Sequence, residues 1–233
     1  MRIVGAFRRR FVPARGKQLY FTPIRGKLMP SRLVNLQKTL TWGDFGAPRP
    51  GPDPAPGAVA TAAQMRATHQ HTVNGEVVPG THPPQYRLKD DVTITVILQR
   101  AQIFVNAWVF RQPTSFQDAV LRHEQGHYDM VALFCRDLFI DLMALKSRTF
   151  ARGADLISAI NGIFRTYDRL IAAVHGPYDT DTQHGRNPQK QQRWDGIIQR
   201  AFTQPRNPPV TAPDGTAYKV PLLDCLRGAG VTI

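Results

Sequence analysis

Residues 121–129 read Leu-Arg-His-Glu-Gln-Gly-His-Tyr-Asp, and they lie in the middle of a long segment whose apolar residues keep helical spacing. Between about 114 and 146 no proline interrupts this spacing, and Thr114 or Ser115 is expected to cap the start of the helix. Gly126 is the one residue of this interior that disfavours a helix. Since an interior glycine costs about 1 kcal/mol relative to alanine, it indicates that another group approaches the backbone there.

The chain before this helix has the residue pattern of β-strands. Residues 92–98 alternate in a way that predicts a strand with one face on the core. The pair Asn74-Gly75 stands between β-forming residues, which predicts a two-residue hairpin turn. Residues 103–110 predict a further strand.

Two more helices are expected after the long one. The first covers about 154–174 and ends at His175-Gly176-Pro177, because glycine and then proline disfavour continuation. The second covers about 189–202. Strands first and helices later predict an α+β fold, with an antiparallel sheet followed by the long helix and further helices.

The composition of the 233 residues suits a globular chain, because 42% are hydrophobic and 20% are charged. No apolar run reaches the roughly 18 residues that a membrane-spanning helix needs, and no apolar stretch of signal-peptide length follows the basic first residues. Cys135 and Cys225 are too few for a disulfide framework or a cysteine-based zinc knot, and the sequence leaves open whether they pair.

Positive charge is concentrated at the start of the chain. Of the net charge of +13, residues 1–40 contribute ten Lys and Arg and no acid. We therefore divide the chain into a basic arm at 1–39, a folded domain at 40–202 and a proline-rich segment at 203–233. Such an arm is either a solvated leader or a contact, through residues 1–38, for nucleic acid or another anionic surface.

The motif His123-Glu124-Gln125-Gly126-His127 has the spacing of a metal site. Histidines at i and i+4 lie one turn apart on one helix face, so both imidazoles can reach one Zn²⁺. Glu124 then lies beside the metal, where it can accept a proton from a water molecule. The chain has only two glutamates, which makes a chance match rare. The competing interpretation is an amphipathic helix with two surface histidines.

A catalytic zinc needs a third protein ligand, and the sequence offers several downstream. His184 lies in a polar loop predicted at 176–185, between two helices, and it is followed by glycine, which favours it. Asp179, Asp181 and His175 are also candidates. The hydroxyl of Tyr178, in the same stretch, is a candidate to stabilise the oxyanion of a tetrahedral intermediate.

The chain resembles a bacterial family of predicted secreted zinc-dependent proteases that is catalogued as a domain of unknown function. The resemblance spans roughly residues 38–200, and the motifs that carry it occur in the same order: Leu40-Thr41-Trp42-Gly43-Asp44-Phe45, Ala60-Thr61, Ala107-Trp108-Val109, residues 121–129, Tyr178-Asp179-x-x-Thr182-x-His184-Gly185 and Gln191-x-x-Trp194. It implies a zincin-like metallopeptidase, favours His184 as the third ligand, and suggests a secreted or periplasmic protein. The chain departs from the family in its basic arm and in showing no signal peptide.

Two functions are consistent with these patterns. The first is a zinc metallopeptidase in which His123, His127 and His184 hold the metal, Glu124 is the general base, Tyr178 assists, and the substrate is a protein or peptide. The second is a basic nucleic-acid-associated protein with a structural metal or none, or a metalloprotease recruited to DNA by the arm. A water-accessible position on the metal would separate the two, because a structural site is closed by a fourth protein ligand.

Overall fold

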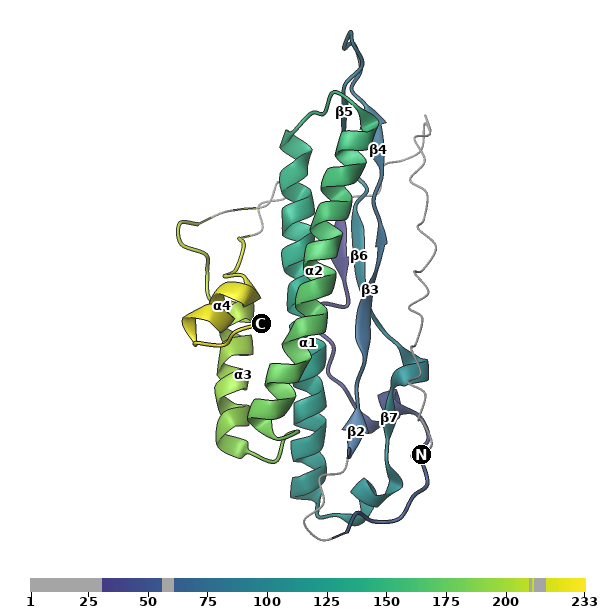
Figure 1. Cartoon of the computed structure of the whole chain (residues 1–233), viewed down its shortest axis with the longest axis vertical. Helices are drawn as coiled ribbons and strands as arrows, with labels where there is room; N and C mark the ends of the chain where they lie inside the picture. Colours follow the sequence, from purple (N-terminus) through teal and green to yellow (C-terminus); the bar gives the residue numbers. More distant parts are fainter. Residues whose placement is uncertain (1–30, 56–60, 210, 212–216) are drawn as a thin grey trace, which may run out of the picture.

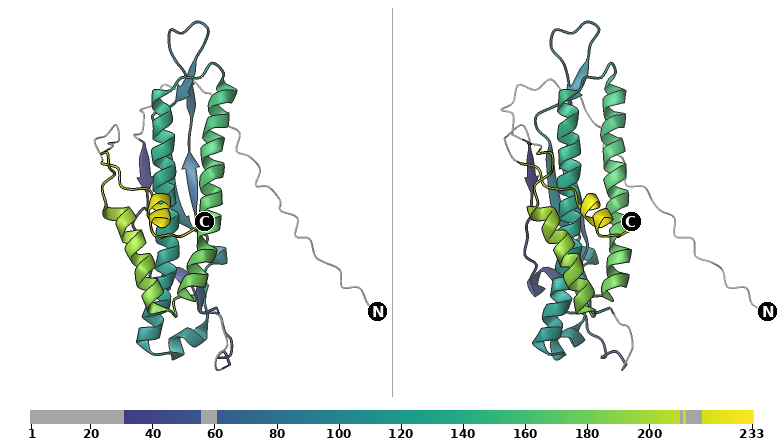
Figure 2. Two further views of the ribbon diagram at one scale, coloured as in Figure 1. Left: turned by 60° about the vertical axis from the view of Figure 1, so that its left-hand side comes forward. Right: turned by 90° about the vertical axis from the view of Figure 1, so that its left-hand side faces the viewer.

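The fold is taken from a computed structural model, which describes residues 31–55, 61–209, 211 and 217–233. Three layers pack on one another (Figure 1). A sheet lies on one side, two long antiparallel helices form the middle, and two shorter helices cover the other side (Figure 2). The predicted α+β class is confirmed at this level. Residues 1–30 of the predicted basic arm lie outside the described residues.

The main sheet has the strand order β1-β6-β3, formed by Arg32–Val34, Thr93–Leu98 and Ala67–Thr72. β6 is central, runs antiparallel to β3 and runs parallel to β1. The strand predicted at 92–98 is confirmed, since Val92, Ile94 and Val96 are buried in the core. The sheet is mixed and not purely antiparallel, because β1, from the segment predicted to be part of the arm, pairs with β6 in parallel.

The hairpin predicted at Asn74-Gly75 is wrong. Neither residue has the positive φ that a two-residue type I′ turn requires. Instead β4 (Gly75–Val77) continues from β3 and pairs with β5 (Tyr86–Leu88), so the turn lies further along, at 78–85. This turn projects past the ends of the two long helices (Figure 1). Asn74 binds across the ribbon, where its amide donates to Asp91 and its carbonyl accepts from Lys89.

The strand predicted at 103–110 is mostly a 3₁₀ helix. Only Phe104–Val105 forms a strand, β7, which pairs antiparallel with β2 (Ala63–Gln64). Residues Ala107–Arg111 form the 3₁₀ helix η3, and earlier in the chain Trp42–Phe45 forms another, η1. Trp108 and Val109 of η3 are buried. The apolar residues at 107–110 are therefore explained by burial of one 3₁₀ turn and not by the face of a strand.

The long helix α1 extends from Thr114 to Ala144, as predicted, and continues into the 3₁₀ turn η4 (Leu145–Ser147). Its first residue follows Pro113, and no side chain caps it, so the predicted cap at Thr114 or Ser115 is wrong. In its middle the helix is buried on most sides, because the sheet, α2 (Gly153–Thr182) and α3 (Pro188–Thr203) all pack on it.

Helix α2 does not end at Val174 but continues for two more turns, through Gly176 and Pro177, to Thr182. Proline lacks the N–H that would bond to the preceding turn, yet the helix persists because Val174, Tyr178 and Thr182 are fully buried against α1 and α3. This extension brings the residues predicted to lie in a polar loop onto the face of a helix.

Helix α3 confirms the helix predicted at 189–202, and the side chain of Asn187 caps it by accepting from the Lys190 N–H. The chain then forms α4 (Leu222–Gly228), which packs on α3 and α1. The folded unit is therefore wider than 40–202, since β1 and α4 belong to it. Cys135 and Cys225 are both buried and both free. No helix in the described parts of the chain is long and apolar enough to cross a membrane.

The group that approaches Gly126 is the Tyr178 ring of α2. A β-carbon at position 126 would overlap the Tyr178 hydroxyl, so only glycine lets the two helices pack this closely. We expect Gly126→Ala to destabilise the protein by about 1–3 kcal/mol in urea unfolding. The matched control is Gly196→Ala in α3, which has open space around it and should gain up to about 1 kcal/mol. Equal effects at the two positions would contradict this account of the helix packing.

Candidate metal site

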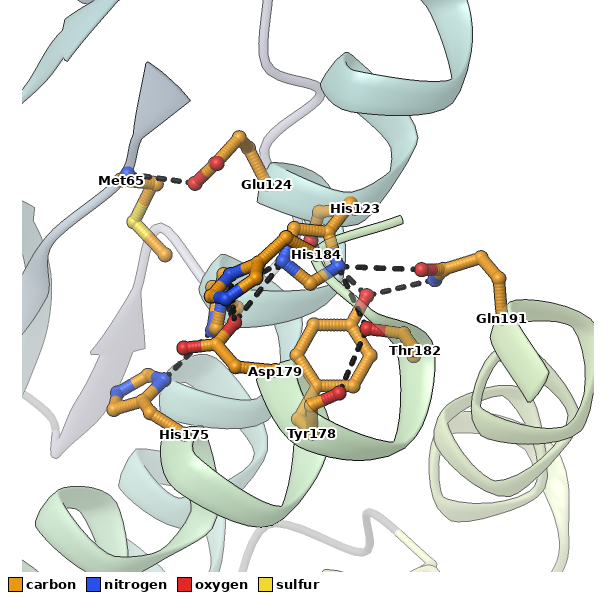
Figure 3. A network of polar contacts seen from close by, with 10 residues as sticks. Met65, His123, Glu124, His175, Tyr178, Asp179, Thr182, His184 and Gln191 are labelled. Carbon is orange, nitrogen blue, oxygen red and sulfur yellow. Dashed lines mark hydrogen bonds and ion pairs between the residues drawn. The ribbon is translucent and has the colours of Figure 1, made fainter. Parts of the chain in front are cut away.

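The candidate site lies where the last two turns of α2 pack against the middle of α1 (Figure 3). Helix α1 contributes His123, Glu124 and His127. Helix α2 contributes His175 and Asp179. The two imidazoles of the motif are almost fully buried, with residue exposures of 2% for His123 and 7% for His127.

Three ligand atoms converge on one point. The Nε2 atoms of His123 and His127 are 3.2 Å apart. Oδ1 of Asp179 lies 3.1 Å from the first and 2.8 Å from the second. A tetrahedral zinc with bonds near 2.0–2.1 Å would separate its ligand atoms by about 3.3 Å. The His123–His127–Asp179 group could therefore hold a metal ion with small outward shifts of its side chains.

The structure places Asp179, and not His184, beside the two histidines. His184 Nδ1 is 3.6 Å from Asp179 Oδ1, and the His184 side chain is 52% exposed at the rim of the site. The sequence predicts a loop at 176–185, in which a histidine followed by glycine could swing inward. Because α2 continues to Thr182, Asp179 faces α1 directly, and His184 falls in the turn after the helix.

That turn is tight and left-handed. Gln183, His184 and Gly185 have φ values of 53°, 54° and 81° in succession. A β-carbon on Gly185 would lie 2.8 Å from Cβ of His123, so glycine is required both by its φ and by its contact with α1. The turn holds His184 close to the three converging atoms without inserting it among them.

Asp181 and His175, also candidates for the third ligand, have different partners. Asp181 accepts from the indole N–H of Trp194 and pairs with Lys190 and Arg193, away from the histidines. His175 Nδ1 lies 2.8 Å from Nδ1 of His127, behind that ring. Burial, and then the neighbouring His127, lower the pKa of His175 to about 3, so His175 is neutral and its Nδ1 can accept a hydrogen bond from the Nδ1–H of His127.

Tyr178 packs against His123. Its ring stacks on the His123 imidazole with centroids 4.6 Å apart. Its hydroxyl donates to the His123 carbonyl at 3.0 Å and accepts from Gln191 at 2.7 Å. Burial raises the pKa of this hydroxyl above its usual range. The hydroxyl therefore already has two buried partners, and the oxyanion contact stays a prediction.

Glu124 lies in the same cavity as the three ligand atoms. It is 4% exposed, and its Oε2 accepts from the backbone N–H of Met65 at 2.7 Å. Met65 follows β2, so the edge of the small sheet fixes the carboxylate (Figure 3). The cavity has a volume of about 140 Å³, and Glu124, His123, His127 and Asp179 line it together with residues 61–66.

The remaining motif residues attach α1 to its surroundings. Gln125 Oε1 accepts from the N–H of Leu40, and its Nε2 donates to the carbonyl of Lys38 and to Asp129. The hydroxyl of Tyr128 donates to the carbonyl of Asn35. The segment that joins β1 to η1 is therefore tied to the same helix turn that carries the histidines. Sequence reasoning missed this role, because nothing in residues 35–40 indicates a partner.

Asp129 makes stability depend on pH. Burial raises the pKa of its carboxyl to about 6, and the nearby Asp195 adds to the rise. The pKa of Asp129 in the folded protein is higher than the ordinary aspartate pKa of 3.8, so the fold favours the protonated carboxyl. The contribution of Asp129 to the free energy of unfolding is therefore present at low pH and is lost as pH rises through about 6.

We therefore expect Asp129→Asn to be about 1–3 kcal/mol more stable than the wild type in urea at pH 8, and nearly equal to it at pH 4. The asparagine oxygen can still accept from Gln125. Asp118→Asn, an exposed change on the same helix, should bring no such gain at pH 8. A gain that does not depend on pH would argue against a raised pKa at Asp129.

Comparisons with protein-family models, with curated proteins and with solved structures find no match for this chain.

Proposed function

We propose that this protein is a zinc-dependent metallopeptidase in which His123, His127 and Asp179 hold the metal and Glu124 is the general base. One observation carries the proposal. Three nitrogen and oxygen ligand atoms lie within 4.8 Å of one another, and a nearly buried carboxylate that is not among them shares their cavity. A metal site with a separate base beside it is the arrangement that metal-assisted hydrolysis requires.

The donor set suits zinc. Two imidazoles and one carboxylate form a set found in catalytic zinc sites, whereas Ca²⁺ and Mg²⁺ prefer oxygen ligands alone. When bound, zinc supplies a Lewis acid for the substrate carbonyl and lowers the pKa of its water toward about 7. With three protein ligands, a fourth position on the metal would remain for water. His184 lies at the exposed rim and is not among the residues whose ligand atoms all lie within 4.8 Å of one another.

Each residue then has a defined task. Glu124 accepts a proton from the attacking water at its carboxylate and passes that proton to the leaving amine. The Met65 N–H orients the carboxylate through Oε2. Burial of the carboxylate in a small cavity keeps bulk water away and strengthens these interactions. His175 and Tyr178 hold the two imidazoles in place from behind.

Metal content and cleavage test the proposal together. Purified protein should contain about one zinc per chain by elemental analysis and should cleave an unfolded protein such as casein. A chelator should abolish cleavage, and added zinc should restore it. Fully zinc-loaded protein that cleaves neither casein nor a peptide library would refute the peptidase, and a fourth protein ligand on the metal would indicate a structural site.

A further inference from the structure

The Nδ1 atom of His123 points away from the metal-binding atoms, toward two buried polar side chains. Gln191 Oε1 and Thr182 Oγ1 each lie 3.3 Å from it. Gln191 is 3% exposed and Thr182 is fully buried, so water does not replace either contact. A neutral imidazole has a hydrogen on one of its two nitrogens, and only the other nitrogen can bind a cation. The partners of Nδ1 therefore decide which nitrogen of His123 is available.

The hydrogen atoms of Gln191 are already assigned by its other partners. Its Nε2 lies 2.8 Å from Asp195 Oδ1 and 2.7 Å from the Tyr178 hydroxyl. Asp195 forms an ion pair with Arg122, and a carboxylate in an ion pair can only accept. The Tyr178 hydrogen goes to the His123 carbonyl, so its oxygen accepts as well. If the Gln191 amide were flipped, its Oε1 would face the oxygens of Asp195 and Tyr178, which are both acceptors. Oε1 therefore faces His123.

Thr182 leads to the same assignment independently. Its hydroxyl donates to the carbonyl of Tyr178 at 2.7 Å, so toward His123 it can only accept. Two acceptors therefore face Nδ1, and neither has a hydrogen to offer. Nδ1 must carry the hydrogen that they share.

We propose that Gln191, assisted by Thr182, is a positioning residue that keeps a proton on His123 Nδ1 and so reserves Nε2 for a cation. Nε2 lies 3.1 Å from the Asp179 carboxylate oxygen, also an acceptor. A hydrogen or a cation can join these two atoms, and because the hydrogen of the ring is held on Nδ1, Nε2 and Asp179 are left to share a cation. The inference rests on the proposed function only where that cation is zinc; the proton assignment belongs to the protein alone.

The proton assignment is tested by ¹⁵N NMR of histidine-labelled, metal-free protein near pH 9. Wild-type His123 should show a protonated Nδ1 and a bare Nε2. The double variant Gln191→Met, Thr182→Val removes both acceptors. The proton should then move to Nε2, which can donate a hydrogen bond to Asp179. Wild-type His123 with its proton on Nε2 would overturn the inference without any variant being made.

Zinc affinity gives a second readout, from competition with a chromophoric chelator. The double variant should bind zinc about 10- to 100-fold more weakly than the wild type, as is typical when an outer partner of a ligand is lost. Gln192→Met, an exposed change one position along α3, is the matched control and should bind zinc like the wild type.

Unchanged zinc affinity in a folded double variant would overturn the inference. A wild type that binds no zinc, but has the Nδ1 proton, would instead refute the proposed function and leave the role of Gln191 supported.

Discussion

Replacing Glu124 by glutamine is expected to lower peptide cleavage by about 100-fold or more while the protein keeps its zinc. The amide has the size of the carboxylate, and its oxygen can still accept from the Met65 N–H, so the fold should persist. What is lost is the group that accepts and returns the proton. The measurement pairs a casein cleavage assay with elemental analysis of the same preparation.

The chain contains its own control for this change. Its one other glutamate, Glu76, lies in β4 and binds Arg87 at the surface of the ribbon. Glu76→Gln should leave both cleavage and zinc content unchanged. If Glu124→Gln cleaves as fast as the wild type, Glu124 is not the base, and any activity of the protein has another origin.

Replacing Asp179 by alanine should remove the metal. Two imidazoles would remain, and they compete poorly with water and chelators for zinc. We expect the loss of affinity to exceed the roughly 10- to 100-fold that loss of an outer contact produces, and cleavage to disappear with the metal. Zinc affinity is measured by the same chelator competition.

Asp181→Ala is the matched control, because this aspartate lies two residues along α2 and pairs with Trp194, Lys190 and Arg193 instead. His184→Ala should weaken zinc binding less than Asp179→Ala, since His184 lies at the exposed rim. The reverse order would restore His184 as the third ligand and would mean that the turn after α2 closes on the metal.

Sequence patterns correctly predicted the elements that depend mainly on the spacing of residues close together in the chain. The spacing of apolar residues predicted α1, α3 and β6, and the histidine spacing placed His123 and His127 on one face. Gly126 indicated a close approach, and Tyr178 makes it. The glutamate beside the histidines lies in their cavity, as the motif predicts.

The errors arose where tertiary packing outweighed local preference. Gly176 and Pro177 disfavour a helix, but burial of Val174, Tyr178 and Thr182 sustains one. This extension changed the expected third ligand, because only a helix turns Asp179 toward α1. Asn74-Gly75 favours a tight turn, but pairing of β4 with β5 places the turn elsewhere. Such outcomes depend on partners distant in sequence.

Because α1 and α2 carry all of the proposed metal ligands and the base, the site depends on the rotational phase of one helix relative to the other. Each residue added inside a helix turns everything beyond it by about 100° and advances it by about 1.5 Å. One residue inserted in α2 before Val174 would therefore carry Asp179 to a different side of its helix. The same insertion in the connection at 148–152 would not change the rotation of either helix about its own axis. Length variation should thus be tolerated in that connection and excluded from α2.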